Sequence, residues 1–81
     1  MKIELTAKAK KQLKRLPKIE AKKVAKKIRL LENHPLVGKK LKGELSDRYS
    51  LKAWPYRIIY VISGKKLVQV DTIEHRQGSY K

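Results

Sequence analysis

The chain of 81 residues contains no cysteine and no long run of apolar residues. The absence of cysteine excludes disulfide bonds and thiolate-bound metals, and nothing in the composition indicates secretion. Residues 1–5 alternate between polar and apolar types, unlike the apolar segment of a signal peptide or a membrane span. The two histidines, His34 and His75, are too far apart to indicate a metal site. We therefore expect a cytoplasmic protein that uses no cofactor, no metal and no membrane.

Acidic residues are also scarce, because seven Asp and Glu stand against 22 Lys and Arg, for a net charge of +15. Such a chain attracts nucleic acid through counterion release. Lysines outnumber arginines by 17 to 5, however, and a lysine-rich surface also serves solubility. The placement of the arginines is more informative, since Arg48, Arg57 and Arg76 lie in the second half of the chain. A guanidinium group matches phosphate oxygens geometrically, so this half is predicted to carry the function.

The first half predicts a strand and two helices within a single domain that spans residues 1–81. Residues 2–5 fit a short strand, and Thr6 is suited to cap a helix that Pro17 ends. The apolar stripe of this helix consists of Ala9, Leu13 and Leu16. A second helix begins near Lys18, ends at residues 33–35, and has its apolar residues on one side, namely Ala21, Val24, Ala25, Ile28 and Leu31.

The second half predicts a loop over residues 36–43 and then strands over 45–53, 56–62 and 66–74. The turns at Trp54-Pro55 and at residues 63–65 are short, so the strands they join must be antiparallel. The expected fold class is α+β with the order β-α-α-β-β-β. A helical hairpin packs on one face of a small antiparallel sheet, and the other face is at least partly open.

Strand alternation indicates which side chains share the open face. Ser50 and Lys52 have one parity in their strand, and Arg57 lies on the side of the next strand opposite the apolar set that suits the helices. The three would form a cluster if the hairpin register brings them together. An arginine in so apolar a strand is paired, exposed, or placed to hold an anion. Its possible internal partners are Glu44, Asp47 and Asp71.

Several short segments form a recognisable pattern, namely Ala9-Lys10-Lys11-Gln12-Leu13, Leu16-Pro17, Asn33-His34-Pro35, Leu41-Lys42-Gly43-Glu44-Leu45, Tyr56-Arg57-Ile58-Ile59-Tyr60, and His75-Arg76 followed by Tyr80. Together they resemble the RelE/ParE superfamily of toxins from type II toxin–antitoxin systems, over nearly the whole chain. The resemblance implies the fold derived above, a cytoplasmic toxin, and a cognate antitoxin with an acidic tail. RelE-like members of the superfamily cleave messenger RNA in the ribosomal decoding site, whereas ParE-like members inhibit DNA gyrase.

The resemblance to the RelE-like branch implies metal-free cleavage with the ribose 2′-hydroxyl as nucleophile. Lys52 would take the proton, Arg57 and Arg76 would bind the scissile phosphate, and Tyr80 would stack on a base or orient the phosphate. Ser50 departs from the pattern, because RelE-like enzymes commonly carry Lys or Arg at this position. One expected cation is therefore missing. Each of these residues also has a structural alternative, such as a solvated strand lysine, an internal ion pair, or a residue of a frayed terminus.

Further residues are predicted to bind nucleic acid, with solubility or turn packing as their alternative roles: Lys10, Lys11, Lys14, Lys22, Lys23, Lys26, Lys27, Arg48 and Trp54. The sequence favours a ribosome-dependent mRNA endoribonuclease that acts on mRNA at the ribosome and is bound by an acidic antitoxin. Two alternatives remain open, namely a ParE-like gyrase inhibitor and an RNA-binding domain without catalysis.

Overall fold

The computed structural model describes residues 2–41, 43, 47–64 and 67–75. Its elements follow the order β1 (Lys2–Leu5), α1 (Ala7–Arg15), α2 (Lys18–Leu30), β2 (Lys39–Lys40), β3 (Arg48–Ala53), β4 (Tyr56–Ser63) and β5 (Leu67–His75). The α+β class and the predicted order are confirmed, with one addition. The interval predicted to be a loop contains the two-residue strand β2, which is too short and too polar for its alternation to be visible in the sequence.

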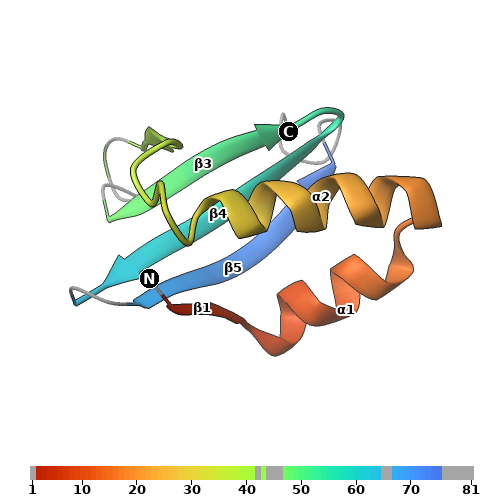
Figure 1. Cartoon of the computed structure of the whole chain (residues 1–81), viewed down its shortest axis with the longest axis horizontal. Coiled ribbons are helices and arrows are strands. Elements are labelled where there is room, and N and C mark those ends of the chain that lie inside the picture. The colour runs from red at the N-terminus through yellow and green to blue at the C-terminus, as the bar shows by residue number, and fades with distance from the viewer. Residues whose placement is uncertain (1, 42, 44–46, 65–66, 76–81) are drawn as a thin grey trace.

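The strands form one sheet in the order β1-β5-β4-β3-β2. β1 pairs with β5 in parallel, and every other neighbouring pair is antiparallel. Both helices lie on the same side of this sheet (Figure 1). The opposite side, called the open face below, is the side expected to carry the cationic residues. Among the described residues, no helix is long and apolar enough to cross a membrane.

The apolar stripes of both helices pack against the sheet as predicted. Ala9 of α1 is fully buried, and Leu13 and Leu16 are partly buried against the same core. α2 contributes Val24 and Ile28, and Leu31 follows directly at its end. The sheet supplies the other buried side chains of this core, namely Leu51, Ala53, Ile58, Tyr60, Val68, Val70 and Ile73. Burial of these side chains is the main favourable contribution to folding and leaves one sheet face for function.

The start of α1 is attached to β5 through Thr6. Its hydroxyl oxygen accepts a hydrogen bond from the N–H of Ala9 at 3.1 Å, as expected of a helix N-cap. The same hydroxyl donates to the carbonyl of Asp71 at 2.7 Å. One side chain therefore caps the helix and joins it to a strand 65 residues later in the chain.

Asp71 is the extra residue of a β-bulge in β5. Ile59 pairs with Thr72 and Tyr60 with Val70, so Asp71 has no opposing residue in β4. A bulge of this kind shifts the alternation of side chains by one position. Val70 before it and Ile73 after it are consequently both buried in the core. The predicted strand of residues 66–74 is correct in extent to within one residue, but strict alternation along it fails here.

The segment before β2 is held by the buried side chain of Tyr60. The phenol donates to the carbonyl of Pro35 at 2.8 Å and accepts from the N–H of Gly38 at 3.0 Å. A Cβ atom at Gly38 would lie 2.5 Å from the Tyr60 oxygen and 3.0 Å from the carbonyl oxygen of Ser50. Glycine at this position thus permits the backbone to approach the sheet closely enough for both hydrogen bonds.

Candidate functional site on the open face

Lys52 and Arg57 are directly opposite each other in the β3–β4 hairpin. Ser50 lies two residues before Lys52 on the same face and opposes Ile59. The turn at Trp54-Pro55 sets this register, because Ala53 and Tyr56 form the last pair before it. The predicted clustering of Ser50, Lys52 and Arg57 is therefore confirmed, and two like charges lie at the distance of a cross-strand pair. Like charges opposed in this way repel each other, which favours binding of an anion between them.

A cleft extends from this pair toward β2. Its lining includes Lys39, Ser50, Lys52 and Arg57, with apolar walls from Val37, Leu41 and Leu51. Lys39 was not among the residues predicted from the sequence to form the site. It belongs to β2, where it pairs with Ser50, so the tertiary structure adds a third cation to the cluster. The pair Lys39-Lys40 in a short polar segment gave no signal that one of the two faces the cleft.

A second cleft lies on the other side of Arg57, which lines both. It contains charges of both signs, because Glu74 and Asp71 of β5 line it together with Arg48 and Lys8. Glu74 is the residue of β5 directly opposite Arg57. Arg57 therefore lies between a lysine of β3 and a glutamate of β5. A carboxylate beside a guanidinium helps to orient it.

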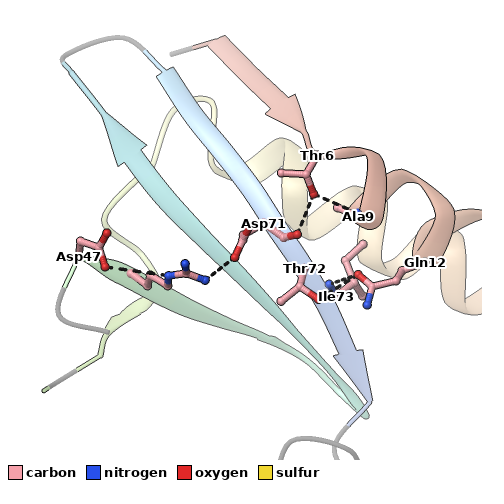
Figure 2. Close-up of polar contacts among 8 residues, drawn as sticks. Thr6, Ala9, Gln12, Asp47, Asp71, Thr72 and Ile73 are labelled. Atoms are coloured by element: carbon pink, nitrogen blue, oxygen red, sulfur yellow. Dashed lines mark hydrogen bonds and ion pairs between the residues drawn. The ribbon is translucent and has the colours of Figure 1, made fainter. Parts of the chain in front are cut away.

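Arg48 forms an ion pair with Asp71 across β4, which separates their two strands. Its Nε also lies 4.0 Å from Asp47 (Figure 2). Asp47 and Asp71, two of the possible partners of Arg57 in the sequence, both contact Arg48. The side chains of Arg48 and Asp71 are about a third exposed, so the pair is only partly shielded from solvent. Nucleic-acid binding by Arg48 remains a prediction, and it would have to compete with Asp71.

Figure 2 also shows how α1 covers the edge of β5 beyond the end of β1. The Oε1 atom of Gln12 accepts from the N–H of Ile73 at 2.7 Å and from the hydroxyl of Thr72 at 3.0 Å. β1 pairs only with residues 67–70 of β5, so this glutamine replaces a strand neighbour at the following positions. The second half of β5, with Glu74 on the open face, is thereby held in place.

Two of the predicted catalytic residues, Arg76 and Tyr80, lie outside the described residues, as does Glu44. β5 ends at His75, directly before Arg76. The ring of His75 packs edge-on against Tyr56, with centroids 5.2 Å apart. Among the described residues, no group of three or more His, Cys, Asp or Glu side chains could hold a metal ion.

The residues predicted to bind nucleic acid through charge lie on the exposed surface of the helices: Lys10, Lys11, Lys14, Lys22, Lys23, Lys26 and Lys27. Lys23 also has a structural role. Its ammonium group lies 3.3 Å from Glu20 and donates to the carbonyl of Trp54 at 2.8 Å, which ties α2 to the hairpin turn. Trp54 is 61% exposed at this turn, and its binding to nucleic acid remains a prediction.

The fold and the site together place the chain in one structural class. It is a small basic α+β domain with two helices on one face of the sheet and a cationic cleft on the other face. Residues 3–80 match the family model described as the ParE toxin of type II toxin-antitoxin systems, parDE. The search of curated proteins finds no match. The chain belongs to the RelE/ParE superfamily and is a toxin of a type II toxin–antitoxin system.

Solved structures agree with this assignment. A chain of the toxin-antitoxin complex RelBE2 from Mycobacterium tuberculosis is 30% identical, with a TM-score of 0.83 over 91% of this chain and 95% of that one. The RelE-RelB complex from Pyrococcus horikoshii OT3 gives 23% identity and a TM-score of 0.79, over 93% of each chain. The isolated E. coli RelE toxin gives 23% identity and a TM-score of 0.77, over 90% of this chain and 81% of that one. The last two likenesses show the fold.

Proposed function

We propose that this toxin is a metal-independent endoribonuclease that cleaves messenger RNA on the ribosome. The observation that carries the proposal is the pairing of Lys52 with Arg57 at the edge of a cationic cleft on the open face. A cluster of this kind suits a phosphate that gains negative charge during the reaction. Inhibition of a protein target through surface contacts would not require it.

In the proposed reaction the ribose 2′-hydroxyl attacks the adjacent phosphorus, and the neutral amine form of Lys52 accepts its proton. Arg57 binds the non-bridging oxygens as their negative charge increases. The bond between phosphorus and the 5′-oxygen breaks, the leaving 5′-oxygen takes a proton from a water molecule, and the products carry a 2′,3′-cyclic phosphate and a 5′-hydroxyl. We further propose that Arg76 binds the same phosphate and that Tyr80 stacks on a base or orients the phosphate.

The direct test is a reconstituted translation reaction in which new 5′ ends on the message are mapped. We expect cuts within ribosome-occupied codons for the wild type and their loss in Lys52→Ala, Arg57→Ala and Arg76→Ala. Arg29→Ala is the matched control, since Arg29 is an exposed arginine of α2 on the helical side of the molecule. An intact message with the wild type, or equal activity of Arg57→Ala and Arg29→Ala, would contradict the proposal.

The lysines of α1 and α2 are proposed to dock the toxin on ribosomal RNA without taking part in the chemistry. Reversing the charges of Lys10, Lys11 and Lys14 should weaken ribosome binding steeply. The reaction rate at saturating toxin should remain near that of the wild type. Lys23 is unsuitable for this test, because its loss would also remove its contacts with Glu20 and Trp54. Unchanged ribosome binding in the triple variant would leave solubility as the role of these lysines.

We also propose that the cognate partner is an acidic antitoxin. The structures similar to this chain include toxin–antitoxin complexes, and a net charge of +15 favours a partner rich in Asp and Glu. Such a partner would raise the melting temperature, because it binds the folded state alone. The measurement is thermal unfolding with and without an acidic peptide from the neighbouring reading frame. Identical melting temperatures would contradict this partner.

Inhibition of DNA gyrase is the second candidate, and the description of the matching family model as a ParE toxin favours it. A gyrase supercoiling assay with the purified chain distinguishes the two activities. Inhibition that persists in Arg57→Ala, together with an intact message in the translation reaction, would support gyrase as the target.

A further inference from the structure

We propose that Lys39 binds the RNA phosphate next to the scissile one and so supplies a cation beside Ser50. This inference rests on the proposed function and extends its site onto β2. Lys39 pairs with Ser50 across the β2–β3 ladder, and both line the cleft that contains Lys52 and Arg57. Cross-strand partners project to the same face of a sheet, so Lys39 lies on the open face with these residues.

The spacing of the cations fits neighbouring phosphates of one strand. Lys39 and Lys52 are diagonal neighbours, because Lys39 opposes Ser50 and Lys52 is two residues further along β3. Diagonal positions in an antiparallel pair are about 7–8 Å apart, within reach of long side chains. This separation is comparable to the step between successive phosphates of an extended single strand. Ser50 lies between them, with a short side chain that is nearly buried.

The backbone that carries Lys39 is fixed on both sides. Before it, the N–H of Gly38 donates to the buried phenol of Tyr60. After it, the N–H of Leu41 donates to the carbonyl of Arg48 at 2.9 Å. A cation on a fixed backbone loses less conformational entropy on binding than one on a free loop, which favours a defined contact with the ligand.

Edge-strand lysines also have a general role, because they discourage pairing with other chains. Lys40 provides the control for that role. It is the other residue of β2, it is exposed and equally charged, and it pairs with Tyr49, so alternation places it on the opposite face from Lys39. Substitution of either lysine lowers the net charge equally. A difference in RNA binding between the two variants therefore results from the position of Lys39 in the cleft and not from the change in net charge.

The experiment measures binding of a labelled hexanucleotide RNA, methylated on every 2′-oxygen to prevent cleavage, by fluorescence anisotropy at several salt concentrations. We expect Lys39→Gln to weaken binding roughly ten-fold, the effect of losing one charge-assisted contact. The slope of log affinity against log salt is negative, and it should become shallower by about 0.7, as for one lost phosphate contact to a single strand. Lys40→Gln should stay within about two-fold of the wild type on both measures, and Lys39→Arg should restore binding.

The outcomes separate this inference from the proposed function. Suppose that Lys39→Gln and Lys40→Gln weaken RNA binding equally while the wild type cleaves messages on the ribosome. This result would overturn the role of Lys39 and leave the proposed function intact. A wild type that does not bind the hexanucleotide also overturns that role. Absence of cleavage by the wild type on the ribosome overturns the proposed function, whatever the binding assay shows.

Discussion

The phenol of Tyr60 accepts a hydrogen bond from the N–H of Gly38 and donates one to the carbonyl of Pro35. Tyr60 is fully buried in β4, where its ring also stacks on Tyr49 with centroids 5.3 Å apart. The segment that leads into β2, and hence the cleft wall that carries Lys39, is thereby attached to the core of the sheet. Stability and the geometry of the candidate site are coupled at this side chain.

Replacing Tyr60 by Phe should lower the free energy of unfolding by about 1–3 kcal/mol. The ring would remain packed, but the Gly38 N–H and the Pro35 carbonyl would lose their buried partner. Urea denaturation followed by circular dichroism measures the change. Tyr56→Phe is the control, since Tyr56 is only partly buried, and it should cost less. Equal stability of Tyr60→Phe and the wild type would show that water replaces the phenol without loss.

Stability should also depend on alkaline pH through Tyr60. Burial raises the pKa of its phenol above the ordinary value of 10.0, the Gly38 hydrogen bond partly offsets this, and Tyr49 adds to it. The folded state therefore holds the proton more tightly than the unfolded state does. The stabilisation that protonated Tyr60 gives the folded state is fully present below pH 10. It is lost as the pH rises from 10 through the pKa of Tyr60 in the folded state.

Denaturation of the wild type and of Tyr60→Phe across this range measures the effect. The difference in unfolding free energy between them should shrink above pH 10. The comparison cancels the titration of the lysines, which both proteins share. A difference that stays constant with pH would contradict the raised pKa.

Replacing Gln12 by Ala should destabilise the fold by about 1–2 kcal/mol, because the Ile73 N–H and the Thr72 hydroxyl would lose their acceptor at the edge of β5. Gln12→Glu is the matched variant, since a carboxylate oxygen can accept both hydrogen bonds. It should retain most of the stability. Thermal unfolding of the wild type, Gln12→Ala and Gln12→Glu gives the comparison. Equal melting temperatures for the two variants would show that the hydrogen bonds accepted at the edge of β5 do not contribute to stability.

Replacing Asp71 by Asn should tighten binding of single-stranded RNA, because it removes a carboxylate from the second cleft and releases Arg48 for phosphate. Asp47→Asn changes the net charge equally but removes only the 4.0 Å contact with Arg48. We expect a gain of about three- to ten-fold for Asp71→Asn and a smaller gain for Asp47→Asn. The anisotropy assay described above measures both. Equal gains would indicate a general charge effect.

Local sequence patterns were sufficient to predict the two helices and the β3–β4 hairpin. The spacing of Ala9, Leu13 and Leu16 identified the buried side of α1, and Pro17 marked its end. The Trp54-Pro55 turn separated β3 from β4 and placed Lys52 and Arg57 on the same side of the hairpin, but the register that opposes them directly came from the structure. These features depend on residues within a few positions of one another, where helix periodicity, strand alternation and turn chemistry act.

The tertiary structure decided the features that join distant parts of the chain. β2 exists because Gly38 and Tyr60 hold two otherwise unremarkable lysines beside β3, and only one of these lysines lines the cleft. The bulge at Asp71 aligns a carboxylate with Arg48 across an intervening strand. No local pattern specifies such contacts, because their geometry depends on register and on packing between segments far apart in sequence. The sequence alone thus indicated the superfamily, every element except β2, and the strands that carry Lys52 and Arg57, while the register of that pair, the third cation and the ion pair of Arg48 follow from how the sheet is assembled.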